Sequence, residues 1–140
     1  MSKEIICIID DDPIYQIITK KIINKTDTEK EIISFSNGAE AIDAFASNVQ
    51  QPEALPNIIL LDIDMPIMDG WEFMASFEKI LPLISKKIAI YIISSSIADS
   101  DKEKAKSYKQ IAGYLSKPLT LENFTAIEKA NTWYSRFLWQ

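Results

Sequence analysis

The sequence predicts an α/β fold, in which helices cover both faces of a parallel β-sheet of five strands. Five short runs of apolar, mostly β-branched residues alternate along the chain with longer segments in which apolar residues recur at helical spacing. Most of the short runs lack the polar alternation of half-exposed strands, as is typical of strands buried on both faces. The 140 residues, of which 47% are apolar, suffice for one domain with a filled core, so we expect residues 1–140 to form a single domain.

The predicted elements alternate along the chain. Asp12 before Pro13 is a helix-start signal, and Pro82 ends or distorts a later helix. After the start signal, four isoleucines recur at helical spacing, namely Ile14, Ile17, Ile18 and Ile22. The predicted strands are Ile5–Ile9, Glu31–Phe35, Asn57–Leu61, Ile88–Ile93 and Gly113–Ser116. The later helices are predicted at Ala39–Ser47, Trp71–Leu81, Ser100–Ile111 and Leu121–Leu138, with loops at Gln50–Pro56 and Met65–Gly70.

Composition and charge exclude several classes of function. The 20 acidic and 15 basic residues give a net charge of −5 without a long basic run, so we expect no direct contact with nucleic acid. No apolar segment has the length of a membrane span or of a signal peptide, and the single cysteine, Cys7, can form no internal disulfide. We therefore expect a cytoplasmic protein with no membrane contact and with Cys7 buried. The absence of histidine excludes histidine triads, histidine metal sites and a phosphohistidine carrier.

Polar residues that can carry chemistry follow the ends of four predicted strands. Because the carboxyl ends of parallel strands meet at one edge of the sheet, we expect these side chains to converge there. Each feature alone has a plainer interpretation, such as a helix cap for the acids before Pro13 or a polar strand end for Ser94–Ser96. Their common position at one edge favours a site instead. The converging residues are Asp10, Asp11, Asp62, Ser94 and Lys117.

This set of side chains predicts a phosphoryl-transfer site. Three clustered carboxylates repel one another and require a cation, and a ligand set made only of oxygen selects a hard cation such as Mg²⁺. Beside such a cation, Asp62 can act as a nucleophile toward phosphorus and form an aspartyl phosphate. The ammonium of Lys117 and the hydroxyl of Ser94 would then share in neutralising the outer phosphoryl oxygens.

The sequence resembles the response-regulator receiver domains of two-component signalling over essentially its whole length. Four motifs carry the resemblance, and their order and spacing make it specific. They are Ile-Ile-Asp-Asp-Asp-Pro at 8–13, Leu-Leu-Asp-Ile-Asp-Met-Pro-Ile-Met-Asp-Gly at 60–70, Ser94 after the fourth strand, and Gly-Tyr-Leu-Ser-Lys-Pro at 113–118. The resemblance implies a stand-alone receiver domain without an output domain. It also implies a flavodoxin-like, doubly wound sheet with the strand order 2-1-3-4-5.

The resemblance assigns roles to the acidic residues. Asp62 takes the place of the phosphoacceptor. Asp11 takes that of the direct carboxylate ligand of Mg²⁺, and Asp10 supports the ion through water. The backbone carbonyl of Asp64 completes the ligands that the protein offers.

For signalling, the resemblance implies that a phosphohistidine on a histidine kinase or a histidine phosphotransfer protein donates to Asp62. Lys117 takes the place of the family's lysine, Ser94 that of its switch hydroxyl and Tyr114 that of its switch aromatic. The phosphoryl group would draw Ser94 inward, Tyr114 would follow, and the face of the fourth helix, fifth strand and fifth helix would change. An unknown downstream protein would read this face. Such a chain catalyses only its own phosphorylation and dephosphorylation and is not otherwise an enzyme.

Neighbouring residues are expected to shape and tune the site. Asp12 is predicted to cap the first helix, and Asp69 and Gly70 are predicted to shape the next loop and start the helix after it. In the family, the positions of Asp64 and Ser96 flank the path of the water that hydrolyses the phosphoryl group. We therefore predict that the acid at position 64 influences autodephosphorylation by orienting or repelling that water.

Two helices offer candidate partner surfaces. The fourth predicted helix carries four lysines and a thin apolar stripe, so we expect it to pack weakly, with its lysines forming either a solvated face or a partner patch. The last helix carries two apolar stripes, of which one suffices to dock it on the sheet. The second predicts a partner or homodimer contact through Trp133 and Phe137, and the alternative is a broad inward face with a frayed end.

Two other functions are open at this point. Asp62-Ile63-Asp64 after an apolar strand also resembles the nucleophile motif of haloacid-dehalogenase-type phosphatases. In those enzymes, however, the motif normally lies on the first strand and precedes the second acidic pair, and turnover of a generic phosphate ester would be needed to favour them. The other alternative is a degenerate receiver that serves only as a scaffold, which the complete set of pocket residues disfavours.

Overall fold

The computed structural model describes residues 3–96 and 98–138, with side chains up to residue 131. Its five strands form one parallel sheet in the order β2-β1-β3-β4-β5, which confirms the predicted fold class. The strands are β1 (Glu4–Ile9), β2 (Lys30–Phe35), β3 (Ile58–Leu61), β4 (Ala89–Ser94) and β5 (Ile111–Ser116).

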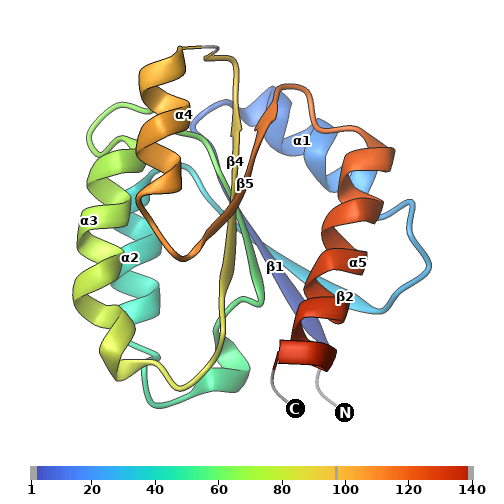
Figure 1. Cartoon of the computed structure of the whole chain (residues 1–140), viewed down its shortest axis with the longest axis horizontal. Helices are drawn as coiled ribbons and strands as arrows, with labels where there is room; N and C mark the ends of the chain where they lie inside the picture. The colour runs from blue at the N-terminus through green and yellow to red at the C-terminus, as the bar shows by residue number, and fades with distance from the viewer. Residues whose placement is uncertain (1–2, 97, 139–140) are drawn as a thin grey trace.

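Helices cover both faces of this sheet (Figure 1). α1 and α5 lie together on one face, and α2, α3 and α4 lie on the other. Short 3₁₀ turns occupy Pro52–Ala54 and Leu81–Leu83, the second of which contains Pro82. Among the described residues, no helix combines the length and the apolarity needed to cross a membrane. The helices are α1 (Pro13–Ile23), α2 (Gly38–Ala46), α3 (Gly70–Ile80), α4 (Asp99–Lys106) and α5 (Leu121–Leu138).

Each face of the sheet has its own apolar core. Successive residues of a strand point to opposite faces, so Cys7 and Ile9 of β1 contact one core while Ile6 and Ile8 contact the other. Cys7 is fully buried, as predicted. The core under α2 and α3 is rich in aromatic rings, with edge and stacked contacts among Phe45, Phe73 and Phe77. The core under α1 and α5 is built on Ile23, Phe124 and Ile127.

Of the four isoleucines that suggest an apolar stripe on α1, only Ile22 packs against the core, and the other three are exposed. Thr19 and Ile23 are the buried residues of this helix, and Gln16 joins them on the inward side through hydrogen bonds to the carbonyls of Asp10 and Phe35. Spacings of three and four residues place positions 16, 19 and 23 on one face, and this face is turned toward the sheet. The side chains left exposed are Ile14 at 66%, Ile17 at 55% and Ile18 at 37%.

The prediction of one helix over Ser100–Ile111 is wrong in its second half. α4 ends at residue 106, and Ile111 opens β5, which is two residues longer at its start than predicted. The physical reason is that Ala105 is the only buried residue of α4. The burial of apolar side chains therefore does little to stabilise a longer helix. The sheet takes up the chain instead, because the N–H of Ile90 donates to the carbonyl of Gln110 at 2.9 Å.

The bounds of α5 agree with the prediction, and its inward stripe is buried at Phe124 and Ile127. The predicted contact residues Trp133 and Phe137 lie outside the residues whose side chains are described. The homodimer contact through them therefore stays a prediction.

Candidate functional site

Three carboxylates converge at the carboxyl edge of the sheet, where the sequence predicts them. One oxygen from each of Asp10, Asp11 and Asp62 lies within 4.8 Å of the others. Asp10 and Asp62 are only 7% and 4% exposed, whereas Asp11 is exposed. Backbone hydrogen bonds just beyond the ends of the strands hold the two buried acids in place. The N–H of Asp62 donates to the carbonyl of Ile9 at 2.9 Å, and that of Asp10 donates to Phe35 at 3.1 Å.

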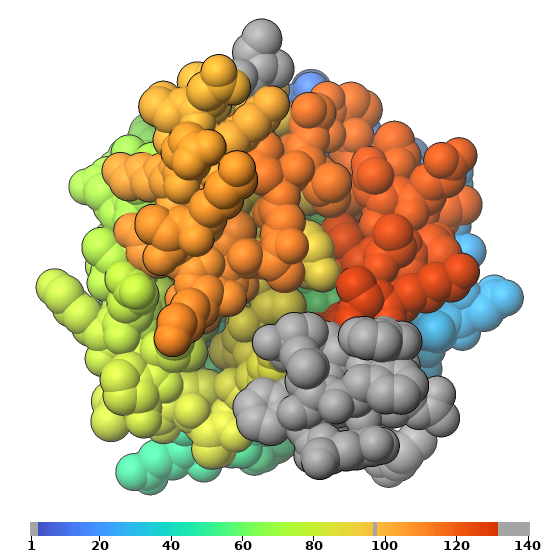
Figure 2. All heavy atoms as spheres, viewed as in Figure 1, coloured from blue at the N-terminus to red at the C-terminus, as the bar shows by residue number. Residues whose placement is uncertain are grey.

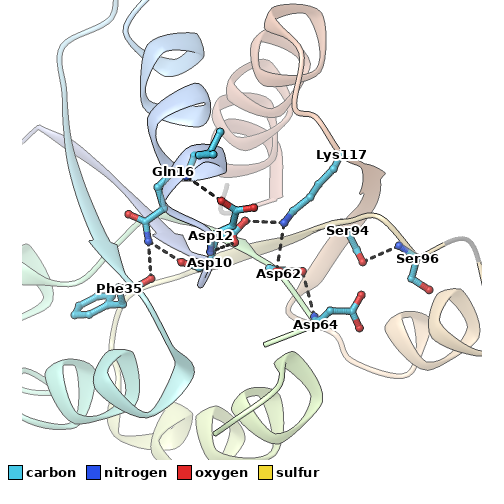
Figure 3. Close-up of polar contacts among 10 residues, drawn as sticks. Asp10, Asp12, Gln16, Phe35, Asp62, Asp64, Ser94, Ser96 and Lys117 are labelled. Atoms are coloured by element: carbon cyan, nitrogen blue, oxygen red, sulfur yellow. Dashed lines mark hydrogen bonds and ion pairs between the residues drawn. The ribbon is translucent and has the colours of Figure 1, made fainter. Parts of the chain in front are cut away.

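Lys117 places its ammonium between two of the carboxylates (Figure 3). Its Nζ lies 2.9 Å from Oδ2 of Asp10 and 3.3 Å from Oδ2 of Asp62, and its side chain is 8% exposed. The N–H of Lys117 donates to the carbonyl of Ser94 at 2.9 Å, so the sheet itself positions this residue. Burial lowers the pKa of Lys117, but the hydrogen bond to Asp10 and the charge of Asp62 outweigh it and raise the pKa above its ordinary value. Lys117 is therefore a cation.

Burial is the main influence on the charge of Asp62. It raises the pKa of this carboxyl to about 6, and the negative charge of Asp10 acts in the same direction. The N–H of Asp64, which donates to Oδ1 of Asp62 at 3.1 Å, and the ammonium of Lys117 lower the pKa without restoring its ordinary value. The ionised carboxylate is thus poorly stabilised by its surroundings, and a further positive charge at the cluster would stabilise it.

The donor set of the cluster fits a hard divalent cation. The three side chains offer oxygen only, and Mg²⁺ in proteins usually binds one or two carboxylates while waters or phosphate oxygens complete its ligands. Both oxygens of Asp10 already accept protein donors, Oδ1 from the N–H of Asp12 at 2.9 Å and Oδ2 from Lys117. Asp11 is exposed at the same place. The division between a direct ligand at Asp11 and a supporting acid at Asp10 stays a prediction.

Ser94 and Tyr114 meet at the backbone of Ser96. Ser94 is fully buried at the end of β4, and its Oγ accepts the N–H of Ser96 at 3.0 Å. In Figure 3 this hydroxyl turns toward Ser96 rather than toward Asp62. The hydroxyl of Tyr114, a half-buried ring, donates to the carbonyl of Ser96 at 3.1 Å. The two residues expected to form the switch are thus joined through one backbone segment.

The predicted helix starts around the site are confirmed. Asp12 caps α1, because its side chain accepts the N–H of Ile14 at 2.9 Å. Asp69 caps α3 in a reciprocal arrangement with Glu72, in which each side chain accepts the backbone N–H of the other residue. Both caps fix the loops that carry the acidic residues.

The loop between β3 and α3 is held tightly at its base. A Cβ at Gly70 would lie 2.6 Å from Cα of Ile63, so only glycine fits where α3 meets the residue after Asp62. At its tip, Ile67 has a left-handed backbone with φ of 70° and is 82% exposed, a strained state for a β-branched residue. The carboxylate of Asp64 is exposed and extends away from Asp10 (Figure 3).

Sequence reasoning missed two residues that support the site from α1. Gln16 donates from Nε2 to the carbonyl of Asp10 at 2.7 Å and to that of Phe35 at 3.0 Å, which ties α1 to the ends of β1 and β2. Tyr15 presents its ring to Lys117, whose Nζ lies 4.2 Å from the ring centroid. The sequence carries no signal for either contact, because the fold brings Phe35 to Gln16 and Lys117 to Tyr15.

Sequence reasoning also missed the acid that anchors α4. Asp101 accepts the indole N–H of Trp71 on α3 at 3.1 Å and the hydroxyl of Ser96 at 2.6 Å. The Trp71 ring stacks on Tyr108 with 6.2 Å between centroids and carries the ammonium of Lys104 at 5.3 Å. The thin apolar stripe of α4 is therefore supplemented by polar and aromatic contacts to α3 and to the end of β4.

The described residues leave little enclosed space at the carboxylate cluster. A space of only about 10 Å³ lies beside Lys117, lined by Asp10 and Asp62 but not by Asp11. A hollow of about 430 Å³ opens elsewhere, between β4, β5 and α5 (Figure 2), but its described lining includes none of the three acids. The acidic site therefore suits a small group presented from outside rather than an enclosed organic substrate.

Comparisons with known proteins agree with this geometry. The sequence model described as the response regulator receiver domain matches residues 6–128. A two-component response regulator from Cytophaga hutchinsonii has a similar structure, with a TM-score of 0.84 and 29% identity, covering 94% of this chain and 98% of that one. A receiver domain protein from Methanospirillum hungatei has a TM-score of 0.69 and 26% identity, with 98% of each chain covered.

Curated relatives include both short and long proteins. Two-component response regulator 24 of Arabidopsis thaliana is 27% identical over 126 residues, which are 90% of this chain and 82% of that protein. Protein-glutamate methylesterase/protein-glutamine glutaminase 3 of Leptospira interrogans is 33% identical over 98 residues, 70% of this chain. The matched part is 25% of that relative, so this chain spans about a quarter of its length. With the family match running from β1 into α5, this chain belongs to the response regulator receiver domains of two-component signalling.

Proposed function

We propose that Asp62 accepts a phosphoryl group, in a reaction that requires Mg²⁺, from a phosphohistidine of a partner kinase or phosphotransfer protein. The observation that carries the proposal is a buried lysine ammonium 3.3 Å from a buried carboxylate, with two further acids beside them. An oxygen of Asp62 attacks phosphorus, and the new O–P bond forms as the N–P bond to the partner histidine breaks. The electron pair of that bond returns to the imidazole nitrogen, which takes up a proton.

The chain's own residues stabilise the charge that moves in this step. Lys117 already lies at an oxygen of Asp62, so its ammonium faces the outer phosphoryl oxygens as they gain charge. The cation would be held by Asp11, Asp62 and the backbone carbonyl of Asp64, with Asp10 as the supporting acid. Mg²⁺, when bound, neutralises the carboxylates and the phosphoryl oxygens.

The donor protein has a ready docking surface beside the site. α1 starts directly after the acidic cluster, and the apolar side chains of Ile14, Ile17 and Ile18 are exposed on its outward side. Exposed apolar surface next to a reacting group marks the place where a partner lies. A further exposed apolar side chain, that of the strained Ile67, lies in the loop after Asp62. We refer to these residues as the isoleucine rim, which comprises Ile14, Ile17, Ile18 and Ile67.

Phosphorylation would then act on the face formed by α4, β5 and α5. To donate to a phosphoryl oxygen on Asp62, the hydroxyl of Ser94 would rotate toward Asp62 and away from the N–H of Ser96, whose hydrogen bond it accepts. Release of Ser96 loosens its bonds to Asp101 and Tyr114, which anchor α4 and β5. The result is a shift between two packings that a downstream protein reads.

The direct test is incubation of the chain with acetyl phosphate and Mg²⁺, followed by intact mass spectrometry. We expect one phosphoryl addition in the wild-type chain, its loss in Asp62→Asn, and its loss on chelation of the metal. Asp12→Asn is the matched control, because Asn caps a helix about as well as Asp and Asp12 holds α1 without belonging to the carboxylate cluster.

Three outcomes would count against the proposal. Addition that persists in Asp62→Asn would place the phosphoacceptor elsewhere. Addition that survives chelation would remove the metal from the reaction. Absence of addition in the wild-type chain with acetyl phosphate, phosphoramidate and a phosphorylated partner would favour a receiver that serves as a scaffold.

A further inference from the structure

Lys117 contacts one group besides the carboxylates, the aromatic ring of Tyr15. Its Nζ lies 4.2 Å from the centroid of that ring, well within the range of about 6 Å for a cation–π interaction. Tyr15 lies in the first turn of α1, and Lys117 follows β5. The contact therefore joins the beginning of the chain to the end of the last strand, across the phosphoacceptor.

The lysine needs a contact that is independent of the acids. Both of its carboxylate partners, Asp10 and Asp62, belong to the cluster that offers ligands to a cation. A bound cation would therefore compete with Lys117 for the negative charge of these carboxylates. A lysine side chain also has several rotatable bonds, and fixing it costs conformational entropy. The Tyr15 ring attracts the ammonium without adding a negative charge. It therefore neither competes for the cation nor adds to the repulsion among the carboxylates.

The space around the contact supports this reading. Tyr15, Asp62 and Lys117 together line the small space of about 10 Å³ beside the lysine. Its other walls are Asp10 and mainly apolar residues such as Leu60 and Leu119. The Lys117 side chain is 8% exposed. Without the ring, the lysine would border a larger space into which its side chain could move.

We propose that Tyr15 is a positioning residue for Lys117. Its ring holds the ammonium at the oxygen of Asp62, in the place where the outer phosphoryl oxygens arrive. The inference rests on the proposed phosphorylation of Asp62 and adds to it a residue that acts through Lys117, without contact to the phosphoryl group. Because the ring face makes the contact, phenylalanine can replace tyrosine in this role and leucine cannot.

The first experiment measures the rate of Asp62 phosphorylation by acetyl phosphate at saturating Mg²⁺. We expect Tyr15→Leu to lower the rate by about threefold to tenfold, the size of effect for a cation–π contact at a largely desolvated site. Tyr15→Phe should keep a rate close to that of the wild-type chain. Tyr108→Leu is the matched control, since Tyr108 is also half-buried but stacks on Trp71, and its rate should be unchanged.

The second experiment measures the contact in the metal-free protein. Urea unfolding of Tyr15→Leu, Lys117→Met and the double variant, with a chelator present, gives the coupling between the two side chains. We expect Tyr15→Leu to lower the folding equilibrium constant by about threefold to thirtyfold more in the presence of Lys117 than in the Lys117→Met background.

The outcomes separate this role from the proposed function. The role is overturned if Tyr15→Leu is phosphorylated at the wild-type rate, if Tyr15→Phe falls as far as Tyr15→Leu, or if the coupling to Lys117 is absent. A failure confined to these variants leaves phosphorylation of Asp62 in place. A wild-type chain that accepts no phosphoryl group overturns the proposed function and, with it, this role for Tyr15.

Discussion

Asp62 carries its negative charge in surroundings that oppose it. The pKa of this carboxyl is raised from 3.8 to about 6, chiefly by burial, with the charge of Asp10 acting in the same direction. Because the folded pKa lies above the unfolded one, the folded protein keeps a proton between about pH 4 and 6 that the unfolded chain releases. The stability of the metal-free protein therefore falls as pH rises through this window. The same unfavourable burial of a negative charge favours binding of a cation.

Removal of this charge should stabilise the metal-free protein. We expect Asp62→Asn to raise the free energy of unfolding by about 2–3 kcal/mol at pH 8, the size that the raised pKa implies. The gain should shrink as pH falls through about 6 and vanish near pH 4, where Asp62 is neutral in both states. Urea unfolding at a series of pH values, with a chelator present, measures the gain directly.

The control for this prediction is Asp64→Asn. Asp64 is also an acid of the site loop, but its side chain is exposed, so its removal should change stability by less than about 0.5 kcal/mol. A gain in Asp62→Asn that stays constant from pH 4 to pH 8 would contradict the prediction, because it would arise from packing rather than from the ionised carboxylate.

At the scale of elements, α1 shows what periodicity can and cannot predict. The isoleucines of α1 correctly indicate a helix, and Asp12 correctly marks its start. The rotation of the helix is set instead by Gln16, whose hydrogen bonds to two backbone carbonyls bring Thr19 and Ile23 inward. Such hydrogen bonds depend on residues that are distant in the sequence. In addition, an apolar stripe that stays exposed has the same helical period as one that packs in the core, so periodicity cannot distinguish the two. For this reason neither the isoleucine rim nor the contact of Tyr15 with Lys117 follows from the sequence.

The exposed side of α1 leads to a prediction on donor specificity. We expect Ile17→Glu to lower phosphoryl transfer from a phosphorylated histidine kinase or phosphotransfer protein by about tenfold or more, as for loss of a central apolar contact. Ile17 is 55% exposed, so the free protein should fold normally. Phosphorylation by acetyl phosphate, which needs no docking surface, should be unchanged. Transfer kinetics with both donors measure the difference.

Ala75→Glu serves as the matched control for this prediction. Ala75 is an exposed apolar residue on α3, on the opposite face of the sheet, and its substitution adds the same charge. Equal loss with both variants would indicate a general effect of charge. Equal loss of Ile17→Glu with both donors would indicate damage to the site. Either result would remove the isoleucine rim as the docking surface.

At the scale of the whole molecule, the fold and the convergence of the acids could be predicted because few rules suffice. Apolar runs of strand length alternate with helices, and parallel strands bring their carboxyl ends to one edge, so Asp62 and Lys117 had to lie close together. The point where α4 ends and β5 begins could not be predicted from the sequence. The end of this lysine-rich helix depends on hydrogen bonds between the following residues and β4, which only the fold brings together. The hydrogen bond between Asp101 and Trp71 could not be predicted either, because the two residues lie on different helices and no sequence pattern links them.

That contact extends the site across the molecule. A series of hydrogen bonds begins at the buried hydroxyl of Ser94, which accepts the N–H of Ser96. The hydroxyl of Ser96 donates to Asp101 on α4, and Asp101 also accepts the indole N–H of Trp71 on α3. Each bond in this series is short, between 2.6 and 3.1 Å, and each partner lies on a different element or loop. If the phosphoryl group draws Ser94 away from Ser96, the indole of Trp71 loses part of what holds its acceptor in place.

Trp71 should therefore report phosphorylation at a distance from Asp62. We expect addition of beryllofluoride and Mg²⁺, a mimic of the phosphoryl group, to change the tryptophan fluorescence of the wild-type chain. Because Trp133 and Trp139 also fluoresce, Trp71→Phe supplies the background, and the change should be absent from it. Ser94→Ala, which removes the hydroxyl at the start of the series, should bind the mimic but show a smaller change. A change that persists in Trp71→Phe, or one that is equal in Ser94→Ala, would mean that the signal travels by another route and that α4 is not controlled through Asp101.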